Sequence, residues 1–428
     1  MLRPPRPGRY SPGRVAPVAP SSPPARIHPA SLVWLAGVVA ALHIGKLPPA
    51  IPVLRDALGV SLVEAGFLLS TVQVAGMLIG VLMGLATDSL GLRRSVLLGL
   101  LILGGGSLAG TWAQSPAMLM ALRAAEGVGV LLTVLPAPSL IRRLVEPQRL
   151  AARLGGWGAY MPTGTSVAML AGPLVMGALG WQGWWGVLGG VSLAVALWVW
   201  VAVPADPRRA AVASVTGPQA TMGPSTDSAG ARLLLTLSHR GPWWVALCFA
   251  LYSSQWLAVV GFLPEVYAQA GVAGSHAGWM TALVSAVNIV GNVSAGRWLQ
   301  RGVAPVRLLV VGFVCMTLTA ALAYAPFTAA WPWLRYGAVL LFSSVGGLLP
   351  GTLFSLAVRV APSERTVATT VVWVQQCSST GQFLGPPLVA WVASQVGGWQ
   401  WTWVVTGSAS LVGLALVWRL AGLLQNSK

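Results

Sequence analysis

Three ionisable side chains stand inside long apolar segments of the chain, where charge is costly. Lys46 lies about fifteen residues into the first apolar segment, and Arg123 lies near the start of the fourth, followed three residues later by Glu126. At about 1.5 Å per helical residue, Lys46 is roughly 22 Å from the beginning of its segment. Because the fourth segment runs the other way, Arg123 reaches a similar depth, and Glu126 is expected on the same helix face nearly one turn deeper. Since a charge at the membrane centre costs about 2.5–3.5 kcal/mol on insertion scales, each of these residues is a functional candidate.

Together, Lys46, Arg123 and Glu126 predict a site that binds a solute and couples it to protons. Two cations and one carboxylate can neutralise each other when no solute is present, and an anionic solute can compete with Glu126 for either cation. Protonation of Glu126 then frees the cations, which links proton movement to solute movement. The alternative is an interhelical salt bridge that only stabilises the fold. His43, one turn before Lys46, is either a proton relay or a hydrogen-bonded core histidine.

The composition indicates an integral membrane protein. Of the 428 residues, 55% are hydrophobic and only 8% are charged, whereas about 25% of the residues of a soluble protein are charged. Apolar runs of about 20 residues recur through nearly the whole chain, and each can cross roughly 30 Å of hydrocarbon. The alternative, a large buried helical core, requires far more polar surface than this composition provides.

The net charge of +17 does not indicate nucleic-acid binding, because the basic residues follow a membrane pattern. All Lys and Arg residues except Lys46, Arg55, Arg123 and Arg335 fall in the N-terminal tail, the C-terminal end or alternate loops. This positive-inside pattern predicts a multi-pass protein of the cell inner (plasma) membrane with both termini in the cytoplasm. Attraction to anionic lipid accounts for the same arrangement.

Twelve apolar segments are expected to span the membrane, six on each side of a long loop rich in Pro, Ala, Ser and Gly. They cover residues 31–54, 62–87, 95–112, 118–140, 150–177, 184–203, 243–266, 277–299, 306–325, 333–358, 367–394 and 401–423. The predicted domains are a disordered cytoplasmic tail (1–29), an N-terminal six-helix lobe (30–203), a cytoplasmic linker (204–241), a C-terminal six-helix lobe (242–423) and a cytoplasmic C-terminus (424–428). Residues 232–240 of the linker suit either a short surface helix or plain linker.

Tryptophans gather near the predicted outer ends of the spans, as in an aromatic belt. They are Trp112, Trp181, Trp184, Trp185, Trp331, Trp333, Trp399, Trp401 and Trp403. Arg335 is expected at the same outer rim.

The two halves of the chain repeat each other. The fifth span carries Gly172-Pro173 and the eleventh carries Gly385-Pro386, and each pair is followed by Gly-Trp-Gln. The second and eighth spans each place two glycines eighteen residues apart, at Gly66/Gly84 and Gly278/Gly296. Repeats in the same order and orientation predict two parallel lobes related by a pseudo-two-fold axis along the membrane normal. Chance matching in a glycine-rich chain is the alternative.

Residues 76–94 form the most specific motif, a helix with glycine at every fourth position that ends in a short charged loop. The glycines make a smooth stripe that lets another backbone approach closely and slide. The motif positions are Gly84, Asp88, Gly91, Arg93 and Arg94. Their pattern resembles the signature between the second and third helices of major facilitator superfamily transporters, with Ser89 where the family usually has a basic residue. The resemblance implies that these residues gate the conformational change, with Asp88 at the inner start of the eleventh span, near Arg365; a solvated loop charge is the alternative for Asp88. Because the loop lies at a membrane edge, Arg93 and Arg94 are expected to reach water.

Further patterns resemble the same family. Leu119, Arg123, Glu126, Gly127 and Gly129 are spaced as in its fourth-helix signature, whose arginine is associated with proton coupling; Glu126 replaces a more usual Gln. The run from His43 to Pro49 looks like the cyanate/nitroimidazole permease branch, which favours a small anionic or polar solute. Gly172-Pro173 is similar to the antiporter signature of drug exporters, but Ala168 and a missing glycine pair weaken that interpretation.

The second half offers no clear buried charge, so its polar side chains are the candidates to complete a cavity. The residues assigned to solute binding, beside Lys46, Arg123 and His43, are Tyr252, Gln255, Asn288 and Gln375. Interhelical packing is the alternative for each. Cys248, Cys315 and Cys377 are dispersed in apolar segments and indicate neither a disulfide framework nor a zinc site. We expect no cofactor and no enzyme activity, because no phosphate-binding loop or nucleophile–base motif occurs.

The prediction is therefore an all-α integral membrane protein with the major facilitator fold, acting as a secondary active transporter. It moves a small anionic or polar solute by alternating access, coupled to protons. The expected partners are the solute, protons and membrane lipid, with no nucleic acid, and the functional unit is a monomer. The alternatives are a proton-driven exporter of drugs or metabolites and a non-transporting sensor on the same fold.

Overall fold

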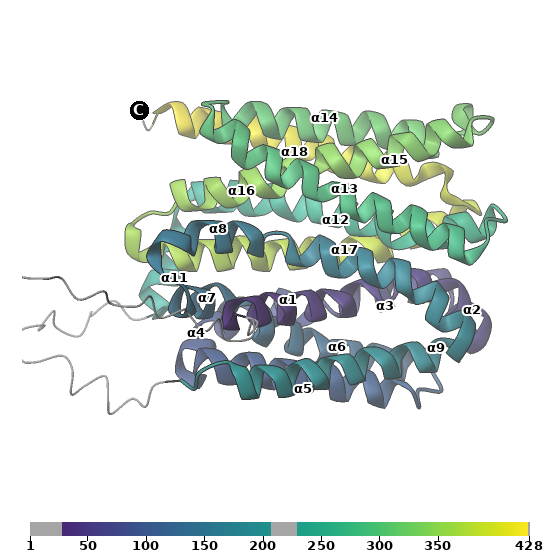
Figure 1. Cartoon of the computed structure of the whole chain (residues 1–428). Coiled ribbons are helices and arrows are strands. Elements are labelled where there is room, and N and C mark those ends of the chain that lie inside the picture. Colours follow the sequence, from purple (N-terminus) through teal and green to yellow (C-terminus); the bar gives the residue numbers. More distant parts are fainter. Residues whose placement is uncertain (1–27, 207–228, 427–428) are drawn as a thin grey trace, which may run out of the picture.

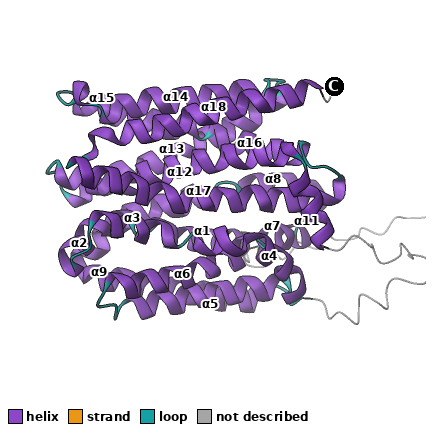
Figure 2. Ribbon diagram, turned by 180° about the vertical axis from the view of Figure 1, so that it is seen from behind, coloured by secondary structure: helices purple, strands orange, loops and turns teal. Residues whose placement is uncertain are grey.

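The computed structural model describes residues 28–206 and 229–426, with the side chains of residues 85–89 among the few omitted within that range. Every regular element in this part of the chain is an α- or 3-10 helix, as Figure 2 shows. The long helices lie side by side and run back and forth across the molecule (Figure 1). We call the end with the loop at Arg93 and Arg94 the arginine end, and the opposite end, with Trp112 and Trp333, the tryptophan end.

Each of the first six predicted spans corresponds to a helix or to consecutive helices. The elements are α1 (Pro29–Gly45), η1 (Pro48–Ala50), α2 (Ile51–Leu58), α3 (Leu62–Thr71), α4 (Val74–Leu90), α5 (Leu92–Gly110), α6 (Pro116–Val134), α7 (Ala137–Leu144), α8 (Pro147–Trp157) and α9 (Tyr160–Ala202). The last of these holds the end of the fifth span and all of the sixth, because the chain reverses at Gly180, whose φ of 70° suits glycine.

The second half repeats this layout. Its elements are α11 (Ala229–Ser238), α12 (Arg240–Gln269), α13 (Gly274–Gln300), α14 (Pro305–Tyr324), η2 (Pro326–Thr328), α15 (Pro332–Gly346), α16 (Leu348–Arg359), η3 (Glu364–Thr366), α17 (Val367–Val396), η4 (Trp399–Trp401) and α18 (Thr402–Asn426). Helix α11 forms where the sequence allowed a short helix before the seventh span. The C-terminal end of α18 lies at the arginine end, beside α14 (Figure 1).

Hydropathy alone finds fewer spans than the fold contains. Nine segments of the described residues are long and apolar enough to cross a membrane; α9 counts once although it folds back on itself, and α13 and α17 do not qualify. These two helices carry polar side chains that are buried against other helices, such as Asn288 and Gln382. Because those amides are hydrogen-bonded inside the protein, both helices can still lie in the membrane.

The two lobes meet through glycines at equivalent places. A Cβ on Gly66 of α3 would lie 2.8 Å from Pro387 Cα of α17, and a Cβ on Gly278 of α13 would lie 2.7 Å from Pro173 Cγ of α9. The second span thus packs on the eleventh as the eighth packs on the fifth, which agrees with the predicted repeat. Toward the arginine end, a Cβ on Gly296 would meet none of the described atoms within 4 Å. Helix α13 therefore packs closely on α9 at Gly278, whereas no such close packing occurs at Gly296 among the described residues.

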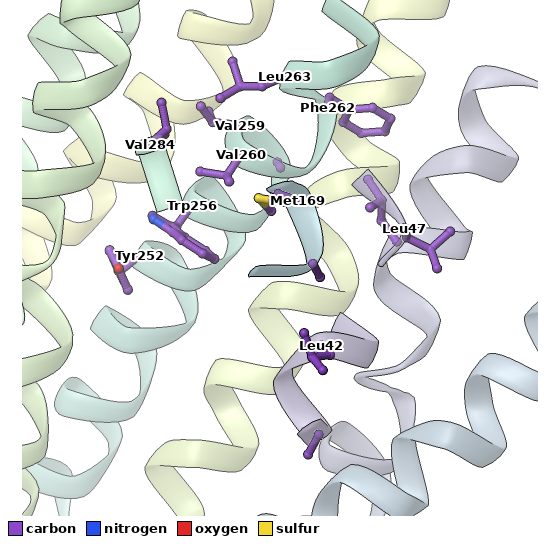
Figure 3. Packing of buried hydrophobic residues seen from close by; sticks show 14 of the residues in the cluster. Leu42, Leu47, Met169, Tyr252, Trp256, Val259, Val260, Phe262, Leu263 and Val284 are labelled. Atoms are coloured by element: carbon purple, nitrogen blue, oxygen red, sulfur yellow. The ribbon is translucent and has the colours of Figure 1, made fainter. Parts of the chain in front are cut away.

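One apolar core extends through both lobes. Figure 3 shows Leu42, Leu47 and Met169 of the first lobe together with Trp256 and Val260 of the second. All five side chains are buried, so apolar contacts continue from one lobe into the other.

The predicted aromatic belt is only partly correct. Trp112, Trp331 and Trp333 are exposed at the tryptophan end. By contrast, Trp181, Trp184, Trp185 and Trp399 are buried, because their indoles pack and hydrogen-bond inside the lobes.

Candidate functional site

A break in the first span positions Lys46. Helix α1 ends at Gly45, and Pro48 and Pro49, which lack N–H donors, prevent it from continuing as one helix into α2. Carbonyl groups near the break accept side-chain hydrogen bonds instead: His43 O accepts from Arg123 Nη1 at 2.5 Å, and Lys46 O accepts from Trp184 Nε1 at 3.2 Å. The break in the first span therefore also draws Arg123 toward it.

The structure brings His43, Lys46, Arg123 and Glu126 together; we call these four residues the charged cluster. Lys46 Nζ lies 2.5 Å from Glu126 Oε1, and Arg123 Nη1 lies 2.7 Å from Glu126 Oε2. His43 Nδ1 is 3.5 Å from Glu126 Oε1, while its Nε2 is 2.8 Å from Ser192 Oγ. The expected common depth and shared helix face are therefore observed, and each oxygen of Glu126 contacts one cation.

The charged cluster is shielded from solvent and unbalanced in charge. The exposed fraction of each of its four residues is 0% or 1%. With a neutral histidine, two cations and one carboxylate leave a net charge of about +1, and an unpaired buried charge is strongly disfavoured. Moreover, Arg123 Nε and Nη2 are buried and have no hydrogen-bond partner among the described residues. These two N–H groups point the same way in a guanidinium and suit a group with two acceptor oxygens.

Residues that the sequence did not indicate complete the surroundings of Lys46. Its Nζ donates to Ser107 Oγ at 3.2 Å and lies 4.7 Å from the centre of the Trp185 ring, over its face. Ser107 Oγ in turn donates to the Trp185 carbonyl oxygen at 2.8 Å. The serines are too common to stand out, whereas the Trp184-Trp185 pair was visible but was assigned to the aromatic belt. The ion pairs and hydrogen bonds of the charged cluster given above all join residues of the first lobe.

The second-lobe candidates do not join the charged cluster. Tyr252 Oη accepts a hydrogen bond from Asn288 Nδ2 at 3.1 Å, and the same amide donates to Ser343 O at 2.8 Å, so both side chains are bound within their own lobe. Gln255 faces α18, where its Oε1 accepts from Ser410 Oγ at 2.8 Å. Gln375 is half-buried on α17. In this conformation Tyr252, Asn288 and Gln255 therefore form contacts between helices, as the packing alternative predicted, rather than lining a site with the charged cluster.

The loop at residues 91–94 is held by the carboxylate of Asp206, a residue of the predicted linker. Asp206 accepts hydrogen bonds from the peptide N–H groups of Arg93 and Arg94, each at 3.1 Å, and from Arg143 Nη1 at 2.7 Å. Burial acts to raise the pKa of Asp206, but these three donors together keep it below its ordinary value. Gly91 adopts a φ of 98°, and a Cβ there would lie 2.6 Å from Asp206 Oδ2.

Of the other motif positions, Gly84 lies at a contact between the two lobes, whereas Arg93 and Arg94 lie at the loop. Gly84 faces α17, where an added Cβ would lie 3.4 Å from Val372 Cγ1, so the predicted glycine stripe does meet another helix. Arg94 is exposed, as expected, but Arg93 is half-buried and its Nη2 donates to the Trp200 carbonyl oxygen. The side chain of Asp88 lies outside the described residues, as does its expected contact near Arg365.

Polar contacts also join the two lobes. At the tryptophan end, Arg55 of α2 forms an ion pair with Glu265 of α12. Deeper in the bundle, Gln73 Nε2 donates to Gln382 Oε1 at 3.0 Å, and Gln376 of α17 bonds to the backbone of α4 through both ends of its amide. The ion pair closes the tryptophan end, whereas the neutral bonds suit a surface along which helices slide.

Comparison with known proteins gives a consistent result. The model of the Major Facilitator Superfamily matches residues 33–380. A 2-nitroimidazole transporter of Escherichia coli (strain K12) is 25% identical over 384 residues, covering 86% of this chain and 87% of that protein. A bacterial homolog of the human lysosomal transporter Spinster, solved in an inward-facing and occupied conformation, has a similar fold, with a TM-score of 0.74, 17% identity and coverage of 94% and 98%. A D-xylose-proton symporter gives a TM-score of 0.70, 14% identity and coverage of 91% and 97%.

Proposed function

Since this chain belongs to the Major Facilitator Superfamily and is a secondary transporter, we propose that it carries a small polar or anionic solute together with protons. The observation that carries this proposal is the charged cluster, a buried and net positive group in which two N–H groups of Arg123 have no acceptor within the part of the chain that the structure describes. A solute with paired acceptor oxygens supplies both the missing hydrogen bonds and the missing negative charge.

The chemistry of the similar E. coli protein agrees with this solute class. By its name, that protein transports 2-nitroimidazole, a small flat molecule whose nitro group has two adjacent oxygen acceptors. A carboxylate presents the same pair of oxygens with a full negative charge, and bidentate pairing with Arg is favourable for either geometry. The solute proposed here therefore carries a planar two-oxygen group.

Glu126 is the proposed proton-coupling residue. Its two oxygens contact Lys46 and Arg123, so a proton on Glu126 removes the negative charge that holds both cations. The net charge of the cluster then rises from about +1 to about +2, which strengthens its attraction for an anion. By linkage, a bound anion strengthens proton binding to the same extent. Co-binding of proton and solute corresponds to symport.

Alternating access is proposed to expose this site to each side in turn. The buried core across the two lobes closes the cluster in the present conformation, so the lobes at 30–203 and 242–423 must rock about their glycine contacts, with the linker at 204–241 joining them. The positive-inside pattern supports a cytoplasmic arginine end and cytoplasmic termini. The Arg55–Glu265 pair then closes the outer side.

Transport by the purified full-length protein in proteoliposomes tests the proposal. Small anions and nitro-compounds are supplied with an inward proton gradient, and uptake is compared among wild type, Arg123→Gln and Glu126→Gln. The expected result is loss of uptake for Arg123→Gln, and loss of gradient-driven accumulation with retained solute exchange for Glu126→Gln. The exposed Glu364→Gln serves as the matched control.

The outcomes separate this proposal from its alternatives. Unchanged kinetics in both Lys46→Gln and Arg123→Gln refute the binding role, and accumulation by Glu126→Gln refutes the coupling role. A sensor binds solute but gives no flux. An exporter instead raises drug resistance in cells, so that deletion of the gene increases sensitivity.

A further inference from the structure

A cavity lies away from the charged cluster, within the second lobe at the tryptophan end. Its volume is about 450 Å³, and its walls come from α12, α13, α15, the end of α14 and η4. Small-molecule sites commonly have volumes of about 300–1,000 Å³. We call it the tyrosine cavity after Tyr267, Tyr324 and Tyr336, which line it together with Trp399 and Arg335.

The aromatic wall of the tyrosine cavity is fixed by contacts with its surroundings. Tyr336 Oη donates to Met280 O at 3.3 Å. Trp399 Nε1 donates to Gln269 Oε1 at 3.0 Å, and its ring lies 4.9 Å from that of Phe262. Side chains held in this way lose little freedom when a ligand binds, which favours affinity. Rings on several sides suit a flat aromatic ligand.

One polar atom in this wall lacks a partner. The Tyr267 hydroxyl is buried and forms no hydrogen bond in the described structure. A buried hydroxyl without a partner is unfavourable, so an acceptor atom from a ligand is stabilised there.

Arg335 gives the tyrosine cavity a positive charge. Its Nε donates to Thr328 Oγ1 at 3.1 Å and its Nη2 donates to Ala325 O at 2.8 Å, which holds the half-buried guanidinium in place. Both acceptors are neutral, and within the described residues no carboxylate lies within ion-pair distance of Arg335. Glu265, which accepts a hydrogen bond from the cavity-lining Gln269, is paired with Arg55. The cavity therefore combines aromatic walls with an unneutralised cation.

We propose that the tyrosine cavity binds a small aromatic anion, with its ring among the tyrosines and Trp399 and its anionic group on Arg335. This site is distinct from the charged cluster: it belongs to the other lobe and opens near the tryptophan end. The proposal does not depend on the identity of the transported solute.

Binding of radiolabelled benzoate to the purified full-length protein in nanodiscs tests this proposal. Because the charged cluster is itself proposed to hold a carboxylate, every variant carries Arg123→Gln as a common background. This background is expected to bind benzoate saturably, and the affinity is expected to fall by about tenfold or more when Arg335→Gln is added, which removes the charged donor. Ala270→Trp fills the cavity from an exposed wall position and keeps Arg335, so it should abolish binding even if Arg335→Gln perturbs the loop at Ala325. Arg301→Gln, an exposed arginine of the same lobe at the other end, is the matched control and should bind as the background does.

Competition experiments define the ligand class. Neutral benzamide and non-aromatic cyclohexanecarboxylate should each compete about tenfold less well than benzoate, because each lacks one of the two recognised features. The proposal is overturned by an absence of saturable benzoate binding up to millimolar concentration, or by binding that persists in Ala270→Trp. It is also overturned if wild type binds benzoate but the Arg123→Gln background does not, which would locate benzoate in the charged cluster.

Discussion

Removal of the carboxylate of Glu126 should leave two neighbouring buried cations without their partner. Lys46 Nζ and Arg123 Nη1 lie 2.5 and 2.7 Å from its oxygens. At an effective dielectric constant of about 20, each contact corresponds to an attraction of about 6 kcal/mol, most of which is offset by the cost of burying the charges. Loss of one member of a buried ion pair typically costs about 3–5 kcal/mol. We therefore expect Glu126→Gln to lower the free energy of unfolding by about 3–5 kcal/mol.

A second substitution turns this estimate into a test of mechanism. Glu126→Gln raises the net charge of the cluster from about +1 to about +2, whereas Glu126→Gln combined with Lys46→Met returns it to about +1. If charge balance is the cause, the double variant should recover about 2 kcal/mol or more relative to Glu126→Gln alone, a coupling of the size seen between contacting residues.

The assay is reversible unfolding in mixed micelles at pH 7, followed by tryptophan fluorescence. The exposed Glu364→Gln is the control and should change stability by no more than about 0.5 kcal/mol. Wild-type stability in Glu126→Gln, or a double variant less stable than Glu126→Gln, would refute the assignment of Glu126 as the counter-ion of both cations.

Three further perturbations have defined outcomes. Gly91→Ala should cost about 1–2 kcal/mol in thermal unfolding, because φ is 98° and the new Cβ meets Asp206; an unchanged melting temperature contradicts this. Since the pKa of Asp206 is lowered in the fold, its stabilising contribution should be complete above about pH 4 and be lost as the pH falls through the folded pKa; Asp206→Asn should therefore flatten the acid limb of the stability–pH curve. Replacing Arg55 by Gln removes a half-exposed ion pair with Glu265. We expect the equilibrium between states closed and open at the tryptophan end to shift toward the open states by about 1 kcal/mol, which is roughly a fivefold change in their population ratio. Labelling of a cysteine introduced at that end would measure it, and an unaltered labelling rate would contradict it.

Much of the fold was predictable because the membrane constrains it strongly. The run lengths, the alternating arginine loops and the repeated Gly-Pro pairs predicted the helices, and the glycine stripe of residues 76–94 predicted a close helix contact, which Gly84 makes with Val372. The proximity of Lys46, Arg123 and Glu126 was also predictable, since depth along a spanning helix follows from residue number.

The direction in which a side chain faces around its helix was harder to predict than its depth in the membrane. Trp185 lies near the end of a span, which suggested an interfacial position, but it faces inward under Lys46. Asp206 follows the last residue of the sixth span and seemed part of the linker, but it folds back onto the motif loop. Gln255 faces α18 rather than the other lobe. These orientations depend on how neighbouring helices rotate and pack, which no local pattern records.

The sequence by itself determined that this chain is a helical membrane protein of two repeated halves with three charges at a common depth. Hydrophobic length and the cost of buried charge act locally, so they can be read from residue order alone. Only the tertiary structure decided that the charged cluster closes within one lobe, that Arg55 pairs with Glu265 across 210 positions, and that three tyrosines and Arg335 enclose a cavity in the second lobe. Such contacts join helices that are distant in the chain, and the packing of the whole bundle selects them.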